Sequence, residues 1–522
     1  MVSIRYEKED PLQRAYRSQS GLDEFAVARE QFDRLVSQLG STATMQSPHG
    51  EVEKLIWSDG MEVLRRLFQG HLTRRAHEEP LLSEVIGADN KVRNHRRKLC
   101  ERPLESLFGE VTVQRIGYSQ RGADSLFPLD AQLNLPDDQY SDGLRRRIGL
   151  EAALNSYDVV VARIEETTGG AVPKAQAEQL VVKLAQDFNE FYERVEHQSD
   201  PGTMKEVPLI VSLDGKGIVM RPEGLRQSTR KAAERENHKL KTRLSKGEKR
   251  NRKRTAQVAT VYDIERHVRS AEDVMGSKEN RKDVKPRPKD KRVWAGVKEE
   301  ASEIVGQAIE EALRRDPEKK RPWAILVDGH KQQLTNIKSS LALHGIAKVT
   351  LVLDFVHVLE YLWKAVLCFE EEASDTAERW VQKRMLKILE GKSSDVAAGI
   401  KRSATLRNLS SKQRQAADTC ADYLLNHRDM LKYDECLEQG LPIATGVIEG
   451  ACRHLIKDRM DVTGARWGLE GADAILKLRS LFASGDFDKY FEFHKEKEHQ
   501  RLHSKRFQCS TASFSVQLPG AA

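Results

Sequence analysis

Three short apolar runs in this chain each lead into an aspartate, and a glutamate follows far downstream in a segment with helical spacing. The runs are VPLIVSLDG with Asp214, PWAILVDG with Asp328 and KVTLVLDFVH with Asp354, and the glutamate is Glu449 in ATGVIEGACRHLIKDRM. A strand holds a carboxylate at its C-terminal edge with little freedom. Several such strands that converge with one helix can therefore build a carboxylate cage for a divalent metal ion.

The aspartates also have structural interpretations. Asp214 in LDGKG and Asp328 in VDGH each precede a glycine that lets the backbone turn sharply, as at the end of any strand. Asp354 would make a good N-cap for the helix VLEYLWKAVLCF, with His357 in the first turn. A role of Asp354 and His357 as metal ligands is the alternative to that cap.

Glu449 lies in a segment whose residues Ile448, Cys452, Leu455 and Ile456 define one apolar helical face. Arg453 and Lys457 follow it by four and eight residues, which is also the spacing of an exposed ion-pair ladder. Such a ladder leaves Gly446 and Gly450 unexplained, because glycine weakens a helix whose only task is stability. Small neighbours suit a position where a backbone or a phosphate must come close.

The elements that would position these residues follow one order. Strands are predicted at residues 207–213, 257–264, 293–297, 323–327 and 349–353, with a helix at 299–315 after the third strand. Five strands with a helix after the third is the order of the ribonuclease-H-like fold, in which the first and fourth strands carry the first two carboxylates. The predicted fold is therefore an α/β ribonuclease-H-like catalytic core.

Further segments are predicted around this core. A helical stretch between Asp354 and Glu449 is too long for a loop and predicts an all-helical insertion domain. Helical spacing at residues 22–39 and 51–72 predicts a mainly helical N-terminal DNA-binding region. Farther along, the sequence predicts a helix, a turn at 168–171 and a second helix with Pro173 in its first turn. This pattern fits either a helix-turn-helix or an ordinary helical hairpin. The expected segments are 1–105 (helical), 106–200 (strands and helix-turn-helix), 206–370 (core), 371–440 (insertion), 441–485 (core completion with Glu449) and 486–522 (polar, frayed tail).

Positive charge is concentrated in one segment. The 522 residues carry a net charge of +7, yet residues 226–254 alone hold thirteen Lys or Arg against three Glu. Such a run indicates a polyanionic partner, with nucleic acid the first candidate, or else a solvated basic loop. The interpretation as a DNA-contacting arm assigns DNA binding to Arg250, Arg252, Lys253 and Arg254, and on the Glu449 helix to Arg453 and Lys457.

Composition limits the class of protein. Charged residues make up 32% of the chain, and no apolar stretch has the length that spans a bilayer or forms the core of a signal peptide. The six cysteines are scattered without a C-x-x-C pair, which favours reduced thiols. We therefore expect a cytoplasmic, nucleoid-associated protein with no membrane partner.

The ordered set of motifs resembles the bacterial insertion-sequence transposases of the ISKra type, related to the Mutator-like DDE superfamily. The matching pieces are SLDGKG (212–217), LVDG (326–329), LDFVH (353–357), TGVIEGACR (445–453), KDRM and GARWG (464–468). The resemblance covers most of the chain. Each piece is short, and their order carries the specificity.

The resemblance implies a DNA transposase with Asp214, Asp328 and Glu449 as catalytic metal ligands. Asp354 and His357 match an accessory signature of such enzymes, and the basic insertion separates Asp214 from Asp328 by 114 residues, which leaves Asp328 and Asp354 as alternative second ligands. Two Mg²⁺ or Mn²⁺ ions would support attack on a DNA phosphodiester. The expected partners are transposon ends, target DNA and further copies of the chain assembled on DNA.

Two other functions fit the same residues. One is a ribonuclease-H-like nuclease that cuts DNA without joining it, and the other is a domesticated DNA-binding protein that has lost catalysis. The intact acidic set argues against the second of these. The helical insertion and the N-terminal region favour transposition over cleavage alone.

Overall fold

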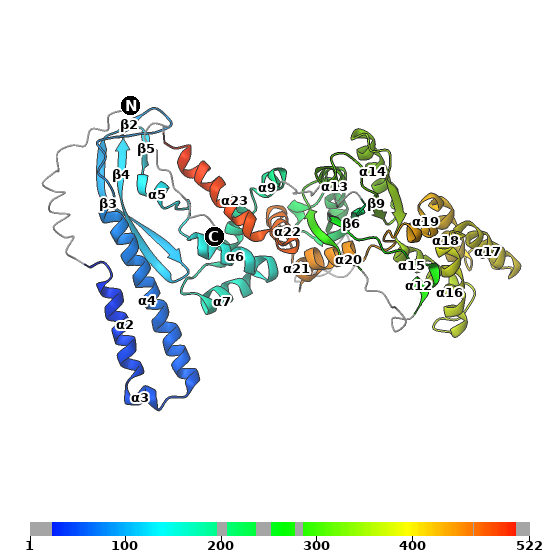
Figure 1. Cartoon of the computed structure of the whole chain (residues 1–522), viewed down its shortest axis with the longest axis horizontal. Helices are drawn as coiled ribbons and strands as arrows, with labels where there is room; N and C mark the ends of the chain where they lie inside the picture. Colours follow the sequence, from blue (N-terminus) through cyan, green and yellow to red (C-terminus); the bar gives the residue numbers. More distant parts are fainter. Residues whose placement is uncertain (1–22, 196–205, 236–251, 277–285, 463, 508–522) are drawn as a thin grey trace. The chain divides into compact units, whose positions relative to one another are not determined.

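The computed structural model describes residues 23–195, 206–235, 252–276, 286–462 and 464–507. The chain divides into two compact units, of which the first consists of residues 1–191 with 488–522 and the second of residues 192–487. The chain therefore leaves the first unit, builds the second and returns, as the colours of Figure 1 show.

Helices and then strands open the first unit. The helices are α2 (Ala26–Leu39), α3 (Thr42–Met45) and α4 (His49–His77), and the strands are β1 (Val85–Ile86), β2 (Val92–Arg93), β3 (His95–Ser106), β4 (Gly109–Gln120) and β5 (Ala123–Leu126). The helices predicted at 22–39 and 51–72 are confirmed. The helical region predicted for 1–105, however, ends at His77, and the basic segment before residue 106 is strand β3.

Helix α4 completes the sheet of the first unit, whose order is β3-β4-β5. Because β5 pairs only with the end of β4, part of that edge lacks a neighbouring strand. The Gln69 side chain accepts from Thr112 N at 2.8 Å and donates to Thr112 O at 2.9 Å, while Glu79 accepts from Ile116 N at 2.8 Å. These side chains replace the missing strand and close the edge.

The remaining helices of the first unit come from both ends of its sequence. They are α5 (Pro128–Gln132), α6 (Asp142–Leu154), α7 (Tyr157–Thr167), α8 (Lys174–Leu184), α9 (Phe188–Arg194), α23 (Phe487–His499) and the π-helical turn η5 (Gln500–Ser504). The prediction of a frayed tail from residue 486 is wrong over residues 487–504. Glu498 on α23 is bonded at 2.7 Å to the guanidinium of Arg145 on α6, and both side chains are buried.

The second unit is built on a five-stranded sheet. Its strands are β6 (Leu209–Val219), β7 (Lys253–Asp263), β8 (Lys289–Gly296), β9 (Trp323–Val327) and β10 (Thr350–Leu353), in the order β10-β9-β6-β7-β8. β7 runs antiparallel to β6 and β8, whereas β9 and β10 run parallel to β6. All five predicted strands are present, and α13 (Ala301–Arg315) follows the third as expected.

Burial explains why these segments are strands. All five residues of β9 and the first five of β6 are buried, as expected for strands covered on both faces. Helix α13 contacts β6 and β7, and α22 (Leu469–Ser484) contacts the edge strand β8. There Ala295 N donates to Ser480 Oγ at 3.2 Å and Val293 N to Ser484 Oγ at 3.0 Å. Serines of α22 therefore accept hydrogen bonds from backbone N–H groups on the unpaired side of β8.

The long segment between β10 and Glu449 is helical, as predicted. It comprises α15 (Phe355–Val366), α16 (Asp375–Leu389), α17 (Ser393–Leu406), α18 (Gln415–Asn426), η3 (Arg428–Met430) and α19 (Tyr433–Glu438). The other helices of this unit are η1 (Pro222–Gly224), α10 (Gln227–Arg235), α12 (Ala271–Met275), α14 (Lys331–Leu343), α20 (Gly446–Cys452), the π-helical turn η4 (Arg453–Lys457) and α21 (Asp458–Met460). Across the described residues, no helix has the length and apolar character needed to cross a membrane.

Candidate active site at the carboxyl edge of the sheet

Three aspartates lie where the parallel pairing of the second unit ends, Asp214 within β6 and Asp328 and Asp354 directly after β9 and β10. The ladder pairs Ser212 of β6 with Leu326 of β9, and Val327 of β9 with Leu353 of β10. Asp214 and Asp328 lie two positions after the first of these pairs, and Asp328 and Asp354 directly follow the second. Because β9 lies between β6 and β10, Asp328 follows the strand next to β6, and Asp354 follows the strand one farther away.

Asp214 lies inside β6 rather than at its end. β6 stays paired with β7 from Leu209 to Val219, so the predicted turn at LDGKG is absent. A Cβ on Gly215 would lie 2.9 Å from Thr255 Cγ2, which explains the glycine by crowding from β7. The prediction that glycine turns the chain beside the carboxylate holds at Asp328 instead, where Gly329 has a φ of +85°.

The Asp214 carboxylate is engaged by two side chains that the sequence interpretation did not single out. Lys216 Nζ lies 3.0 Å from Oδ2, and the Cys452 thiol donates to the same oxygen at 3.2 Å. Burial, together with the adjacent Asp214 charge, raises the pKa of Cys452, so the thiol keeps its proton. Lys216 follows Asp214 by two residues. Because side chains alternate between the two faces of a strand, a prediction that the strand continues through LDGKG would also have placed both residues on one face.

Asp328 is held by its own loop and by the helical insertion. Its carboxylate accepts from His330 N at 2.8 Å, and its backbone oxygen accepts from the Tyr423 hydroxyl at 3.0 Å. His427 Nε2 lies 3.1 Å from the Gly329 oxygen. The insertion therefore fixes the backbone on which Asp328 is displayed.

Asp354 is the N-cap of α15, as its structural interpretation predicted. It is fully buried, and Oδ1 accepts from Val356 N at 3.3 Å and from Thr445 N at 3.0 Å, while Oδ2 lies 2.7 Å from His357 Nδ1. Burial works to raise the pKa of Asp354, but the hydrogen bonds from His357 and Thr445 outweigh it and lower that pKa. The bond to Asp354 in turn raises the pKa of His357.

Glu449 is carried to the sheet edge by a chain segment tied to β10. Phe355 N donates to Ile443 O at 2.9 Å, next to the bond from Thr445 N to Asp354, and α20 then contacts β6 and β7. Glu449 itself is exposed. Burial works to lower the pKa of Lys216, but the adjacent Asp214 carboxylate outweighs it and raises that pKa. The charge of Glu449 adds a weaker effect in the same direction as Asp214.

The alternative ion-pair ladder is not formed by Glu449. Within the described ranges its side chain has no ion pair, and Arg453 lies 3.6 Å from Asp458 instead. The helix changes to π-helical pairing over Arg453–Lys457, directly after α20. Such π turns occur frequently at functional sites.

The carboxylates as they stand do not enclose a metal ion. Among the residues that the structure describes, no three His, Cys, Asp or Glu side chains are gathered closely enough to hold a metal ion. The donor chemistry nevertheless fits, because Asp214, Asp328 and Glu449 offer the oxygen ligands that Mg²⁺ prefers. The ammonium group of Lys216, which pairs with Asp214 and is influenced by Glu449, indicates that this position attracts a cation.

The predicted DNA-binding residues fall into different environments. Arg250 lies outside the described residues, and Lys253 is exposed in β7. Arg254 is not a free cation, since its guanidinium donates to Val297 O at 2.7 Å, Lys298 O at 3.2 Å and Gly224 O at 3.3 Å. Arg252 is half-buried, whereas Arg453 and Lys457 are exposed.

The predicted helix, turn and helix in the first unit are α7 and α8, which contact each other and α6. Pro173 is the residue before α8 rather than part of its first turn. Ala177, Leu180, Val181 and Leu184 bury one face of α8, and Gln176 and Gln179 are exposed on the other. This arrangement is compatible with both alternatives, a helix-turn-helix and a helical hairpin.

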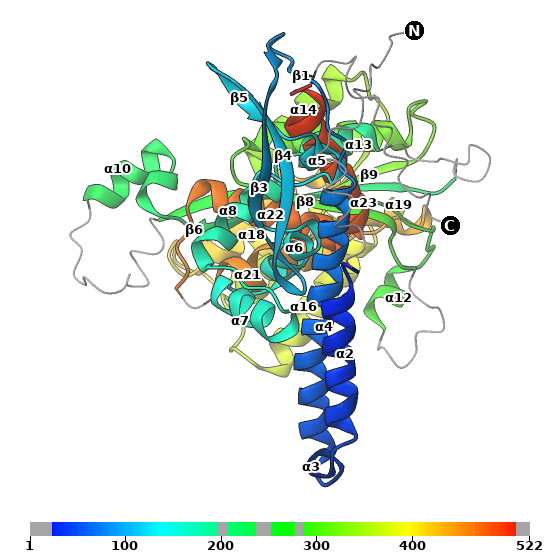
Figure 2. The same ribbon diagram turned by 90° about the vertical axis from the view of Figure 1, so that its left-hand side faces the viewer.

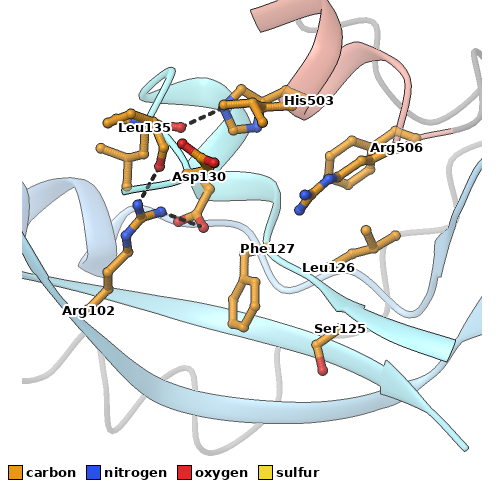
Figure 3. A pocket seen from close by; sticks show the side chains of 12 residues that line it. Arg102, Ser125, Leu126, Phe127, Asp130, Leu135, His503 and Arg506 are labelled. Atoms are coloured by element: carbon orange, nitrogen blue, oxygen red, sulfur yellow. Dashed lines mark hydrogen bonds and ion pairs between the residues drawn. The ribbon is translucent and has the colours of Figure 1, made fainter. Parts of the chain in front are cut away.

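A small pocket of the first unit contains none of the predicted site residues. Figure 3 shows Arg102, Asp130 and His503 in its lining. Arg102 lies 3.6 Å from Asp130, and His503 Nε2 lies 2.9 Å from Leu135 O. Burial lowers the pKa of His503 to about 4, so this histidine is neutral and acts as a packing group for η5.

A scan against protein-family models and a search of curated proteins found no match to this chain.

Proposed function

We propose that the chain is a DDE transposase with a ribonuclease-H-like core, which cleaves and joins DNA strands with the help of divalent metal ions. The observation that carries the proposal is that Asp214 and Asp328 each lie two positions after the last pair of two neighbouring parallel strands, with the Glu449 helix packed against β6. The strand order, with a helix after the third strand and carboxylates on the first and fourth, supports the same assignment.

Asp214, Asp328 and Glu449 are the residues proposed to hold the ions. Bound there, divalent ions would activate a water or a 3′-hydroxyl and stabilise the leaving oxygen of a phosphodiester. Adjacency to Asp214 favours Asp328 over Asp354 as the second ligand, and the hydrogen bonds of the Asp354 carboxylate to Val356, Thr445 and His357 support a structural role for it.

Lys216 holds the Asp214 carboxylate at 3.0 Å and balances its charge. An ammonium at this position also suits a phosphate oxygen of the bound strand, since its side chain is 53% exposed. The buried thiol of Cys452 donates to the same carboxylate and fixes its orientation. Together these two residues hold the Asp214 carboxylate in one orientation.

The test uses the purified full-length chain and a supercoiled plasmid that carries the DNA flanking its coding sequence. With Mg²⁺ or Mn²⁺ we expect cleavage and strand joining, and we expect Asp214→Asn to abolish both while DNA binding is retained. Asp429→Asn is the matched control, because Asp429 is 91% exposed on the helical insertion.

Three other results of this assay would contradict parts of the proposal. Cleavage by Asp214→Asn at the wild-type rate would exclude the metal assignment. Cleavage without joined products would identify a nuclease of the same fold, and DNA binding without cleavage would identify a DNA-binding protein that lacks catalysis.

A further inference from the structure

Strand β3 of the first unit contains a β-bulge in its N-terminal half. Among the described strands β3 pairs only with β4, so it forms an edge of the sheet, and Figure 2 shows the two strands side by side. The register shifts between Arg97 and Cys100, where Lys98 and Leu99 together oppose Ile116 alone. Two residues against one bend a strand and give the extra side chain a new direction. We call Lys98 and Leu99 the β3 bulge.

The backbone of Leu99 has an unusual conformation. Its φ is +54°, in the left-handed region that leucine rarely adopts because its Cβ crowds the following carbonyl oxygen. Among the described residues, the others with a positive φ are Gly, Asn, Asp, Lys or Ala, so Leu99 is the only large apolar residue with this conformation. Leu99 is also 53% exposed, so the fold gains little burial in return. Strain of this kind is typical of functional positions.

Positive charge surrounds the β3 bulge. Residues 91–100 contain five Lys or Arg and no Asp or Glu, and His95, Arg96, Arg97 and Lys98 are all exposed. Within the part of the chain that the structure describes, Arg96 and Lys98 form no ion pair. Cations gathered in this way without acidic neighbours attract a polyanion.

Duplex DNA fits both the charge and the exposed leucine. Its grooves accept protein strands, and its phosphates are the usual partners of Arg and Lys. The step between two base pairs is an apolar slot that admits one side chain, and leucine is one of the side chains that proteins insert there from the minor groove. A membrane fits less well, because a surface that binds lipid presents a continuous apolar face, whereas Leu99 is the single exposed apolar residue of segment 95–101.

We propose that β3 lies in the minor groove of duplex DNA and that Leu99 inserts between two neighbouring base pairs, so that the duplex bends. Arg96 and Lys98 bind phosphates beside the opened step and fix the position of the leucine. The inference goes beyond the proposed catalysis, because insertion and bending require neither a metal ion nor the acidic residues. It also assigns DNA contact to a strand rather than to the helices α7 and α8.

The experiment measures bending by energy transfer between fluorophores at the two ends of a duplex of about 30 base pairs, with the full-length chain and in EDTA. The duplex carries a central TpA step, which unstacks easily. The wild type is expected to bend it by roughly 20–90°. Leu99→Asn should keep the fold, because asparagine tolerates a positive φ, and should remove the bend. Its affinity should stay within roughly tenfold of the wild type, since the phosphate contacts remain.

Three further variants complete the experiment. Leu99→Met keeps a long apolar side chain and should bend the duplex as the wild type does. Leu154→Ala is the matched control, because Leu154 is 45% exposed on α6 of the same unit, and it should also bend the duplex normally. The double variant Arg96→Ala and Lys98→Ala should bind more weakly, with a slope of log K against log salt reduced by up to about 0.9 for each lost phosphate contact.

A wild type that does not bind the duplex, or binds it without a change in energy transfer, would overturn the proposal. Bending by Leu99→Asn to the wild-type angle would overturn it as well. Binding to vesicles of phosphatidylserine and phosphatidylcholine that Leu99→Asn abolishes would assign the β3 bulge to a membrane surface instead. A duplex that is bent but never cut with Mg²⁺ or Mn²⁺ would support this inference and contradict the proposed catalysis, and cleavage without bending that depends on Leu99 would do the reverse.

Discussion

Asp214 and Asp328 each follow the last paired residues of two neighbouring parallel strands, β6 and β9, by two positions. The backbone ladder from Leu209↔Trp323 to Ser212↔Leu326 fixes the strands that carry both residues. A substitution that keeps the strands should therefore change the chemistry of the site while leaving the fold intact. Asp354 follows the next strand, β10, but as a buried helix cap.

We predict that Asp328→Asn and Asp354→Asn have different effects on catalysis. Asp328→Asn should abolish strand cleavage, because an amide is a poor ligand for Mg²⁺. Asp354→Asn should retain cleavage, since an amide oxygen can still accept from Val356 N and Thr445 N. Cleavage assays on purified variants measure both, and the opposite pattern would assign the second metal ligand to Asp354.

We predict that Cys452 resists alkylation in the native protein. Its thiol is buried, it donates to Asp214, and burial and the Asp214 charge raise its pKa, so little thiolate forms at pH 8. Cys100 and Cys368 are only half-buried and should react first. Mass spectrometry of tryptic peptides after iodoacetamide treatment gives the order, and early labelling of Cys452 would contradict the observed contact.

The sequence predicted the strands and helices that carry the acidic residues because their apolar runs are long and their periods are clear. It failed where a partner distant in the chain decides the conformation. Nothing local in LDGKG shows that β6 continues, since glycine is unfavourable in strands. Only the eleven-residue pairing with β7 and the closeness of Thr255 to Gly215 account for the extended conformation there.

The same reason explains why the prediction of a frayed tail is wrong over residues 487–504. The segment is highly charged, and its charges are neutralised by residues about 300 positions earlier in the chain. His494 lies 2.7 Å from Asp187, and Glu498 pairs with Arg145. A polar composition predicts exposure only if such partners are absent, and a single sequence does not show them.

We predict that Glu498→Ala destabilises the first unit by about 3 kcal/mol, because it leaves the buried guanidinium of Arg145 without its strongest partner. Asp488→Ala is the matched control on the same helix. It removes an ion pair with Arg146 whose side chains are 42% and 76% exposed, and the expected cost is under about 1 kcal/mol. Urea denaturation monitored by circular dichroism measures both, and equal costs would contradict a buried role for α23.

We predict that Glu79→Gln makes the first unit more stable at pH 8 and removes part of its pH dependence. Burial raises the pKa of Glu79 to about 7 in the fold, whereas its ordinary value is 4.5. The folded state therefore holds the proton more tightly, so this group's stabilising contribution is present below pH 4.5 and is lost as pH rises to 7. Glutamine stays neutral and can still accept from Ile116 N. Melting temperatures measured between pH 5 and 8 test this, and a wild-type value that does not fall in this range relative to the variant would contradict it.

The last prediction separates structural from DNA-binding cations in the basic segment. Arg254 donates to three backbone oxygens, so Arg254→Ala should cost about 1–3 kcal/mol of stability and leave the salt dependence of DNA binding unchanged. Lys231 and Arg235 are exposed on α10. Their double replacement by alanine should leave stability unchanged and reduce the slope of log K against log salt by up to about 0.9 for each lost phosphate contact. Binding isotherms at several salt concentrations, with end sequences and with random DNA, measure the slopes. A reduced slope for Arg254→Ala at unchanged stability would return Arg254 to the DNA-binding surface, and an unchanged slope for the double variant would identify α10 as a solvated helix.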